Sequence, residues 1–309
     1  MGLLKRYLNG DICTLEPEHL VGRSPRANLL LSASYVSSQH ATIRWGGQHW
    51  ELKDLGSRNG TLVNGERVGA GVACPLPAGI EICFGREEQK WALVDDSAPR
   101  PLIVSEDDPS RSIVVDGEVA AIPDRREPWA TIMRWHDGSW KLEKEEELST
   151  LASGQTFEVL GERWRFVCPA GILGTSTVDW PERTAKGLSA GQLLLKFSRE
   201  EEHVELYLRQ DGELTDLGTR SHNYLLLYLA RKRLAEVDSG LDQASAGWVY
   251  RDDILKDLRI DREHLNLAIF RVRKQFEKAQ VPDAACIIQR RPDSQQLRIG
   301  IADLKAERL

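Results

Sequence analysis

The chain of 309 residues has a net charge of −6, a sequence pI of about 5.8, 41% hydrophobic residues and 28% charged residues. This length favours two or three domains, and the composition is that of a soluble globular protein. The acidic balance excludes an overall basic nucleic-acid footprint, so any DNA-binding surface must be local.

The cysteines and the apolar segments indicate the cellular compartment. Five scattered cysteines without C-x-x-C spacing predict reduced thiols rather than a disulfide framework or a zinc site. No long apolar run follows the first six residues, and no later segment approaches ~18 uncharged apolar residues. We therefore expect a cytoplasmic protein with no signal peptide, no transmembrane span and no membrane partner.

Short alternating segments over residues 10–97 predict a sandwich or barrel of β-strands. Ala41–Trp45 and Trp50–Asp54 alternate in polarity around Gly46-Gly47, which is typical of a β-hairpin. Further short strands are predicted at 80–82 and 91–94. Several strands at regular spacing favour a sandwich or a barrel.

Three polar motifs interrupt these strands. They are Gly22-Arg23-Ser24, Ser37-Ser38-Gln39-His40-Ala41, and the stretch Asp54–Gly65 that contains Arg58-Asn59-Gly60. Arginine offers a rigid fork of charged donors to phosphate oxygens, and serine hydroxyls and the Asn59 amide add further hydrogen-bonding groups. Glycines allow the tight loops that gather such groups at one sheet edge. The motifs predict an anion-binding rim; the alternative is turn chemistry alone.

These motifs, in this order and spacing, resemble the forkhead-associated (FHA) domain, a β-sandwich that binds phosphothreonine peptides. The resemblance implies that Arg23 and Ser37 are phosphate ligands. It implies that Ser38, Arg58 and Asn59 bind phosphate and the flanking peptide backbone, although a basic or amide residue is more usual at Ser38. The remaining implied positions are His40, Gly22 and Gly60 as parts of the loop scaffold, and Tyr35 as a reader of a side chain beyond the phosphothreonine.

Residues 98–170 repeat part of this pattern after a linker near Ser97–Pro101. Ala130-Thr131-Ile132 matches Ala41-Thr42-Ile43, and Trp135 and Trp140 keep the five-residue spacing of Trp45 and Trp50. Residues 160–164 also echo residues 84–91. The copy has residues 126–129 in place of the Ser37–His40 motif and lacks the Asn59-Gly60 loop. We interpret it as a second, smaller, degenerate FHA-like sandwich; the alternative is an unrelated β-domain whose tryptophans coincide by composition.

Two further segments carry weaker signals. The acidic run at 143–147 is typical of a solvated turn, and a sharper hypothesis is that it occupies a basic surface elsewhere in the protein. Residues 171–190 are rich in glycine, serine and threonine and predict a linker, in which Thr175 and Thr177 are candidate phosphorylation sites.

Residues 191–309 predict a domain that begins with strands and continues with helices. A strand pair around 204–213 precedes a helix that Ser221 caps and that reaches Arg231. A short helix follows at 251–258, and Asp261 caps a third. Leu265, Ile269, Val272 and Phe276 form the core face of this third helix, and residues 286–289 and 296–299 form a hairpin.

The outer face of the third helix is basic. Between residues 262 and 278, five Lys or Arg against two Glu give a local charge of +3. The domain resembles the winged helix-turn-helix output domain of bacterial response regulators, through the run Ile269–Phe276, although the family's Gly-Tyr at the wing is missing. The candidate DNA-binding residues are Arg262, Asn266, Phe270, Arg271, Arg273, Lys274 and Lys278 of the helix, with Arg290 and Arg291 of the wing. The alternative is an ordinary solvated helix face on a domain that binds protein.

The sequence contains no Walker loop, G-x-S-x-G, H-E-x-x-H or kinase signature, and its seven histidines show no metal-ligand spacing. We therefore expect a non-enzymatic protein without a metal or cofactor.

The predicted architecture is multidomain, mainly β plus α+β. It comprises an FHA sandwich (1–97), a degenerate FHA-like domain (98–170), a linker (171–190) and a winged helix (191–309). The expected function is that of a bacterial phosphothreonine-responsive transcription regulator. Its FHA domain would bind a phosphorylated Ser/Thr kinase, a kinase substrate or another copy of the chain, which allows homo-oligomers, and its winged helix would bind double-stranded DNA. The alternative is a phosphopeptide-binding scaffold whose winged helix contacts protein.

Overall fold

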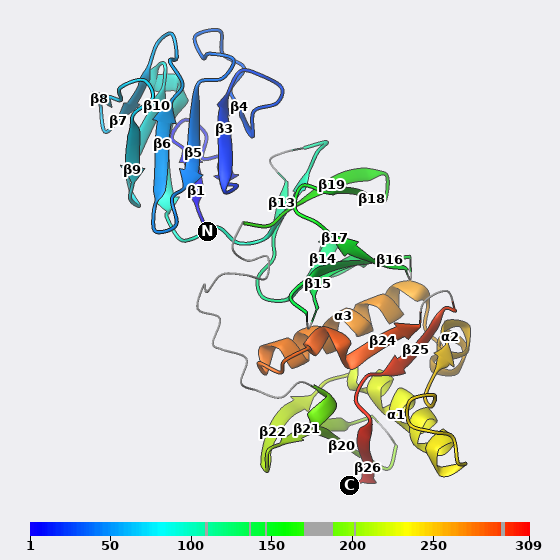
Figure 1. Ribbon diagram of the computed structural model, residues 1–309. Helices are drawn as coiled ribbons and strands as arrows, with labels where there is room; N and C mark the ends of the chain where they lie inside the picture. Colours follow the sequence, from blue (N-terminus) through cyan, green and yellow to red (C-terminus); the bar gives the residue numbers. More distant parts are fainter. Residues whose placement is uncertain (109–110, 136, 146, 170–187, 201, 292–293) are drawn as a thin grey trace. The chain divides into compact units, whose positions relative to one another are not determined.

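The computed structural model describes the chain except residues 109–110, 136, 146, 170–187, 201 and 292–293 (Figure 1). The chain forms two compact units, one of Met1–Val114 with Ser153–Ala170 and one of Val115–Ala152 with Gly171–Leu309. Residues 98–170 therefore contribute strands to both units. Thr175 and Thr177 lie outside the described residues.

The N-terminal part of the first unit is a β-sandwich, as predicted. One sheet has the order β2-β1-β11-β10-β7-β8 and the other has the order β4-β3-β5-β6-β9. The core combines Leu4 and Ile82 from the first sheet with Ile43 and Leu52 from the second, all fully buried. The strands are β1 (Leu3–Arg6), β2 (Ile12–Thr14), β3 (Glu18–Gly22), β4 (Leu29–Leu30), β5 (Ala41–Trp45), β6 (Trp50–Asp54), β7 (Thr61–Val63), β8 (Glu66–Arg67), β9 (Ala73–Leu76), β10 (Glu81–Phe84) and β11 (Lys90–Asp95), with a 3-10 turn η1 (Glu87–Gln89).

The predicted hairpin of β5 and β6 is confirmed. Its ladder pairs Ala41 with Asp54 and Trp45 with Trp50, and β3 pairs with β5 on the other side. Because β3 and β6 both run antiparallel to β5, the ends of β3 and β6 and the start of β5 lie at one edge of the sheet.

Two smaller sheets follow in the chain, one in each unit. The first unit contains the order β13-β12-β19-β18, and the second contains β14-β15-β16-β17. These orders correspond to β2-β1-β11-β10 and β3-β5-β6-β9 of the N-terminal sandwich. The strands are β12 (Leu102–Ser105), β13 (Ser112–Val114), β14 (Val119–Pro123), β15 (Pro128–Arg134), β16 (Trp140–Lys144), β17 (Glu147–Leu151), β18 (Thr156–Val159) and β19 (Glu162–Val167).

The segments that carry the polar motifs have no counterpart in these smaller sheets. Residues 124–127 alone connect β14 to β15, whereas residues 23–40 separate β3 from β5. Likewise, β16 ends at Lys144 and β17 begins at Glu147, whereas residues 55–72 lie between β6 and β9.

The strand register corrects the predicted match between the tryptophans. Arg134 lies opposite Trp140, as Trp45 lies opposite Trp50, when Ile132 and Ile43 are in equivalent positions. Trp135 instead begins the turn, where its N–H donates to Ser139 O at 2.8 Å. The turn is one residue longer than its counterpart, so equal spacing of the tryptophans does not mean equal positions.

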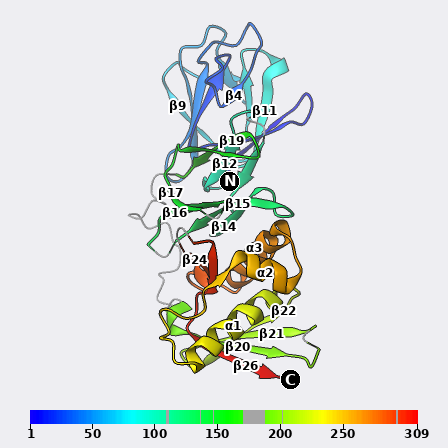
Figure 2. The ribbon, with the colours of Figure 1, turned by 90° about the vertical axis from the view of Figure 1, so that its right-hand side faces the viewer.

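Among its described residues, the C-terminal part of the second unit combines two sheets with the helices α1, α2 and α3, which Figure 2 labels. One sheet has the order β22-β21-β20-β26, with the last strand parallel to β20, and the other has the order β23-β25-β24. Their elements are η2 (Leu188–Ala190), β20 (Gln192–Phe197), β21 (Val204–Gln210), β22 (Glu213–Thr219), α1 (Asn223–Asp238), β23 (Val249–Tyr250), α2 (Arg251–Leu258), α3 (Arg262–Lys278), η3 (Ala284–Ile287), β24 (Ile288–Arg291), β25 (Gln296–Ile299) and β26 (Asp303–Arg308).

The structure confirms one of the two predicted helix caps. Asp261 caps α3 through a hydrogen bond from His264 N at 2.8 Å, as predicted. Helix α1, however, has His222 as its N-cap and no side-chain capping bond, so the prediction for Ser221 was wrong. The helix also continues seven residues past Arg231, to Asp238. Strands β20 and β26 were not predicted.

The core face of α3 is confirmed. Leu265, Ile269, Val272 and Phe276 are all buried in one cluster with residues of α1, β24 and β25. Among the described residues, no helix is long and apolar enough to span a membrane.

Candidate functional site

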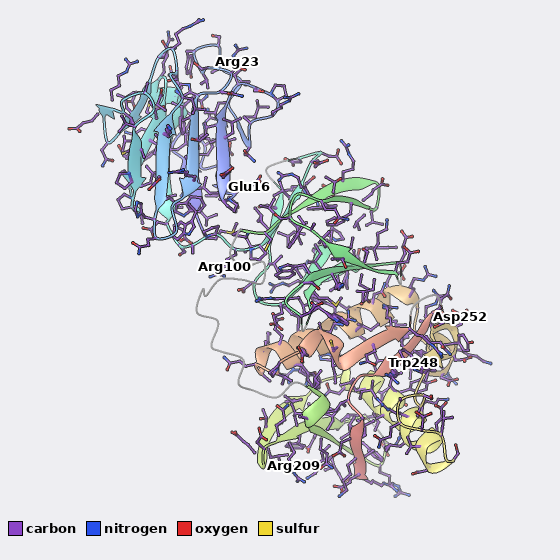
Figure 3. All side chains as sticks on the ribbon, in the orientation of Figure 1. Glu16, Arg23, Arg100, Arg209, Trp248 and Asp252 are labelled. Carbon is purple, nitrogen blue, oxygen red and sulfur yellow. The ribbon has the colours of Figure 1, made fainter. Side chains whose placement is uncertain are left out.

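The side chains of Arg23, Ser37, Ser38, Arg58 and Asn59, called the rim below, come from three loops at one edge of the N-terminal sandwich. The first loop follows β3, the second precedes β5, and the third lies between β6 and β7. Figure 3 labels Arg23 just beyond the end of β3. The strand ladder thus brings together residues that are distant in the sequence.

Hydrogen bonds join the three loops directly. Arg23 N donates to Ser37 O at 2.9 Å, and Arg58 N donates to Ser37 Oγ at 3.0 Å. The Asn59 side-chain amide donates to Tyr35 O at 2.7 Å. All the phosphopeptide-binding candidates of the sequence analysis therefore lie in one connected group of loops.

The backbone requires glycine at two positions of these loops, Gly22 and Gly60. A Cβ on Gly22 would lie 2.3 Å from Ser38 O, whose carbonyl accepts a hydrogen bond from Ser24 N. Gly60 has a φ of +82°, which a residue with a Cβ rarely adopts. Both glycines hold the geometry of the rim rather than contributing groups to it.

His40 is fully buried and connects two of the loops. Its Nδ1 accepts from Ser37 N at 3.1 Å, and its Nε2 lies 3.2 Å from Gly60 O, so the ring proton is assigned to Nε2. Burial lowers the pKa of His40, against the opposing effect of the Gly60 carbonyl. The ring stays neutral at physiological pH, in the scaffold position that the FHA resemblance implies.

Asp54 organises the third loop, and the sequence analysis missed it. Its carboxylate accepts hydrogen bonds from Gly56 N, Ser57 N, Ser57 Oγ and Thr61 Oγ1 at 2.6–2.9 Å. Burial alone would raise the pKa of Asp54, but these hydrogen bonds lower it below its ordinary value. The Asp-x-x-Ser spacing, typical of a loop closed by a carboxylate, is the signal that could have identified it.

Arg86 is a second residue that the sequence did not single out. Its guanidinium lies 4.9 Å from the centre of the Tyr35 ring. It adds a cation beside the position that the resemblance implies for reading peptide side chains. Only its place directly after the Phe84-Gly85 turn could have drawn attention to it.

The rim is cationic and open to solvent. Arg23, Ser38, Arg58 and Asn59 are exposed, and Arg23 Nε donates only to Val36 O, at 3.3 Å. Over the described parts of the chain, neither Arg23 nor Arg58 has a carboxylate within ion-pair distance. Such an arrangement is suited to bind an anion with several oxygen atoms.

The predicted outer face of α3 is covered, which corrects the sequence analysis. Phe270 is 3% exposed and packs in an apolar cluster with Val119, Ala121 and Met133, from strands β14 and β15. Figures 1 and 2 both show α3 lying along the sheet β14–β17, called the covering sheet below. The amphipathic pattern identified the face correctly, but it could not indicate that another part of the chain packs against it.

Arg273 is also buried, at 2% exposure, rather than presented to solvent. Its Nε and Nη2 donate to Ala285 O and Ile288 O at 3.0 and 3.1 Å. The Glu143 carboxylate lies 2.8 Å from Nη2 and also pairs with Arg290. Burial alone would raise the pKa of Glu143, but the two guanidinium groups lower it to about 2.

The remaining predicted residues of this surface differ in exposure. Lys274 is partly buried and donates to Asp116 O at 3.0 Å, while pairing with Glu277. Asn266 is half-buried. Four predicted DNA-binding residues stay exposed: Arg262, Arg271, Lys278 and Arg291.

One residue of the acidic run therefore occupies a basic surface, as the sharper hypothesis held. Glu143 is 6% exposed and fills the space between Arg273 and Arg290. Across the residues that the structure describes, no group of three or more His, Cys, Asp or Glu is arranged to hold a metal ion.

Comparison with known proteins identifies the N-terminal part of the chain. Residues 19–85 match the model of the FHA domain. FhaB of Mycobacterium tuberculosis is 36% identical over 76 residues, which cover 24% of this chain and 49% of that protein. The glycogen accumulation regulator GarA of Mycolicibacterium smegmatis is 37% identical over 85 residues, 28% of this chain and 49% of GarA. The chain thus spans about half the length of these curated relatives.

Among solved structures, the FHA domain of FhaA, crystallised with the intracellular domain of another protein, is 32% identical. The match covers 30% of this chain and 98% of that chain, with a TM-score of 0.27. The residues that match the FHA model, 19–85, include the loops that carry the rim. The N-terminal part of this chain therefore contains an FHA domain.

Proposed function

We propose that the N-terminal domain binds phosphothreonine-containing segments of partner proteins through the rim. The observation that carries the proposal is the convergence of Arg23, Ser37 and Arg58 at one open edge, linked by hydrogen bonds of 2.9–3.0 Å. The FHA family membership of residues 19–85 supports the choice of phosphothreonine over other anions.

The rim offers a distinct contact to each part of such a peptide. Arg23 and Arg58 supply charged donors for phosphate oxygens, and the Ser37 hydroxyl proton is free to donate because its Oγ already accepts from Arg58 N. The Asn59 amide uses its nitrogen on Tyr35 O, which leaves its oxygen for a peptide N–H. Tyr35 and Arg86 lie beside this path and would contact residues that flank the phosphothreonine.

A phosphothreonine peptide-library selection on the purified chain tests this function. We expect retention of phosphorylated peptides and none of the same library after phosphatase treatment. Equal retention of both libraries would contradict the proposal. The selected sequences would also indicate whether the partner is a Ser/Thr kinase, a kinase substrate or another copy of the chain.

We further propose that residues 98–170 derive from a degenerate FHA-like repeat. The two smaller sheets repeat the strand orders of the N-terminal sandwich, and Ile132 opposite Leu142 repeats the pairing of Ile43 with Leu52. The segments missing from the repeat are those that carry the rim, so only one of the two copies would bind phosphate.

For the C-terminal domain, we propose a winged helix whose α3 face packs against the covering sheet instead of binding DNA, so that other surfaces of the domain contact protein. Phe270 and Arg273 are buried under the covering sheet, and Arg273 donates two hydrogen bonds to backbone carbonyls of its own domain. A side chain held in this way is unavailable to read a base edge. The protein would then be a cytoplasmic, non-enzymatic phosphopeptide-binding scaffold.

A DNA-binding transcription regulator is the second candidate. The exposed residues Arg262, Arg271, Lys278 and Arg291 favour it, because they form a local basic surface on an acidic protein. Binding to a random duplex over a salt series tests it. Contact with several phosphates predicts a fall of roughly 0.9 log units per log unit of salt for each phosphate neutralised. Absence of salt-dependent retention would leave the scaffold as the function.

A further inference from the structure

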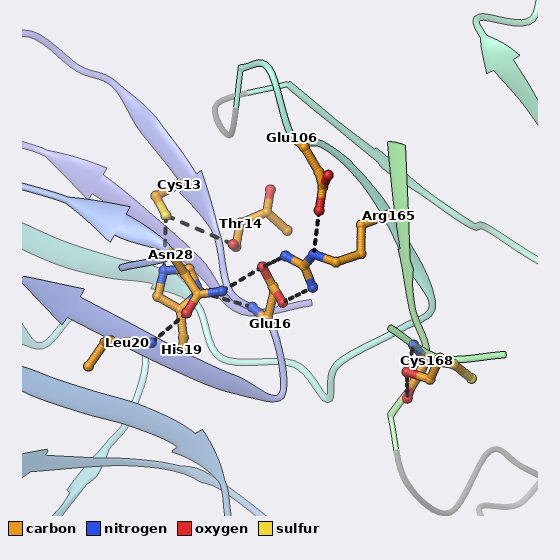
Figure 4. Close-up of polar contacts among 10 residues, drawn as sticks. Cys13, Thr14, Glu16, His19, Leu20, Asn28, Glu106, Arg165 and Cys168 are labelled. Atoms are coloured by element: carbon orange, nitrogen blue, oxygen red, sulfur yellow. Dashed lines mark hydrogen bonds and ion pairs between the residues drawn. The ribbon is translucent and has the colours of Figure 1, made fainter. Parts of the chain in front are cut away.

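We propose that Arg165, on strand β19 of the first unit, is a positioning residue for the phosphate-binding loop of the FHA domain. It acts through Glu16 and Asn28 on residues 23–28, called the anchored loop below (Figure 4). This proposal rests on the phosphopeptide function proposed above and assigns a role to the sheet β13-β12-β19-β18.

The first step is a two-fold contact between the sheet and the FHA domain. Arg165 Nη1 donates to Glu16 Oε2 at 3.0 Å, and Arg165 Nη2 donates to Glu16 Oε1 at 2.9 Å. Glu16 is only 7% exposed. A bidentate pair of this kind fixes the orientation of the carboxylate as well as its position.

The second step passes from Glu16 to the anchored loop. Asn28 Nδ2 donates to Glu16 Oε1 at 2.7 Å, while Asn28 Oδ1 accepts from Leu20 N at 2.8 Å. Both ends of the Asn28 amide are therefore bound, one to the carboxylate and one to strand β3. The side chain has a single orientation as long as Glu16 holds its place.

The third step runs along the loop itself. Strand β4 is parallel to β3, so residues 23–28 return from the end of β3 toward its beginning. At the rim, Arg23 N and Ser24 N donate to Ser37 O and Ser38 O. At the other end, Asn28 is bound to Glu16. The loop that carries Arg23 is thus anchored at two places, and the second depends on Arg165.

The middle of the loop has little other support from this sheet. A cavity of about 350 Å³ is bordered by Pro25 and Arg26 on the loop side and by Ser105 and Arg163 on the sheet side. The loop therefore does not pack tightly against the sheet at Pro25 and Arg26. The connection between the loop and the sheet is the hydrogen bond from Asn28 to Glu16, whose carboxylate Arg165 binds.

Two groups beside Glu16, His19 and Cys13, are neutral, and Arg165 is the cation that pairs with Glu16 among the described residues. Arg165 Nε also lies 4.0 Å from the Glu106 carboxylate. His19 Nδ1 accepts from Glu16 N at 3.2 Å, and burial lowers the pKa of His19 to about 4. Burial also raises the pKa of the Cys13 thiol to about 12. Removal of the guanidinium would leave a buried carboxylate without the cation that pairs with it, which favours displacement of Glu16 from this position.

The experiment measures binding of the whole chain to a fluorescein-labelled phosphothreonine peptide taken from the library selection. We expect Arg165→Gln to weaken binding about three- to ten-fold, because Arg23 is then less often in its binding position. Arg163→Gln is the matched control. Arg163 lies on the same strand, is exposed, and approaches Glu106 only at 4.0 Å, so its replacement should leave affinity unchanged.

A double-mutant cycle separates positioning from a merely structural role. If Arg165 acts through Asn28, then Arg165→Gln should change affinity little in a chain that already carries Asn28→Ala. The Arg165→Lys variant keeps the charge but loses the bidentate geometry and should fall between wild type and Arg165→Gln. Because Lys keeps the counter-charge, it also keeps the test valid if Arg165→Gln does not fold.

The outcomes distinguish this proposal from the proposed function. If the wild-type chain fails to bind phosphorylated peptides, both fail. If the wild type binds and the Arg165 variants bind as tightly as Arg163→Gln, only the positioning role is wrong. Fully additive effects of Arg165→Gln and Asn28→Ala on affinity would also overturn it.

Discussion

The rim contains two arginines, and a second pair, Arg273 of α3 and Arg290 of β24, lies against the covering sheet. The two pairs differ in what surrounds their charge. Arg23 and Arg58 are exposed at a sheet edge, and within the described residues no carboxylate pairs with either. Arg273 is buried, Arg290 is partly buried, and both share the carboxylate of Glu143. The first pair is available to an external anion, while the second already holds an anion supplied by the chain.

The comparison shows that charge in a sequence indicates a binding surface only when the fold leaves that charge unpaired. Both pairs were candidates for binding phosphate groups, of a peptide in one case and of DNA in the other. The pairing partner of the second lies well over a hundred residues away in the chain. The following predictions test this difference, from the largest expected effect to the smallest.

Glu143→Gln should destabilise the second unit by about 3–5 kcal/mol, because it leaves two buried guanidinium groups without a counter-charge. Thermal or denaturant unfolding followed by tryptophan fluorescence measures the change. Glu147→Gln, at an exposed position of strand β17, is the control and should change the free energy of unfolding by less than about 0.5 kcal/mol. Equal stability of the two variants would show that the Glu143 pairing is not what holds the surface closed.

Arg23→Ala should weaken phosphothreonine-peptide binding at least about 100-fold, equivalent to roughly 2.7 kcal/mol. Because the side chain is exposed, the melting temperature should hardly change. Fluorescence anisotropy with the labelled peptide measures the affinity. Arg44→Ala removes an exposed arginine of strand β5 that pairs with Glu51, and it should leave the affinity as it is. A similar loss in both variants would assign the effect to general electrostatics.

Lowering the pH from 7 to 5 should weaken phosphopeptide binding at the rim and leave the ion pairs of Glu143 intact. A phosphothreonine dianion gains a proton near pH 6, so peptide affinity should fall several-fold below that value. The pKa of Glu143 is lowered to about 2 in the folded state, so its stabilising effect is complete above an ordinary value near 4.5 and is lost only as pH falls toward 2.

Peptide titrations at several pH values, together with unfolding of wild type and Glu143→Gln at the same values, measure both effects. A stability difference between the two proteins that already vanishes at pH 5 would contradict the low pKa of Glu143.

Arg271→Ala combined with Lys278→Ala should have the smallest effect on stability and on peptide affinity. Both side chains are exposed on α3, so stability should change by less than about 0.5 kcal/mol and peptide affinity should stay the same. Duplex retention over a salt series is the informative measurement. If the wild type binds duplex DNA and the double variant loses part of the salt dependence, the exposed edge of α3 contacts phosphates despite the covering sheet.

Much of the FHA domain could be predicted because its signals are local. The hairpin of β5 and β6 follows from the alternation around Gly46-Gly47, and the registers agree with it. The rim residues were found because three motifs with unusual glycine, serine and arginine content occur in one order. Asp54 escaped notice because a single aspartate at a strand end has no distinctive pattern until its four hydrogen bonds are seen.

The C-terminal domain could be predicted only in part. Leu265 to Phe276 fall at helical spacing, and Asp261 is a strong cap, so α3 and its core face were predicted correctly. Strand β26 was missed because it pairs with β20 in parallel, a contact between segments about a hundred residues apart that has no local signature. The match of Trp135 to Trp45 failed because a turn that is longer by one residue shifts the register.

By itself, the sequence determined the secondary structure of long periodic segments, the FHA motifs and the absence of those motifs from residues 98–170. These features depend on neighbours within a few positions, where spacing and residue type decide the outcome. Only the tertiary structure decided which charges remain free. Glu143 and Arg273, like Glu16 and Arg165, are paired across more than a hundred residues, and burial and ion pairing are properties of the folded chain that no local pattern records.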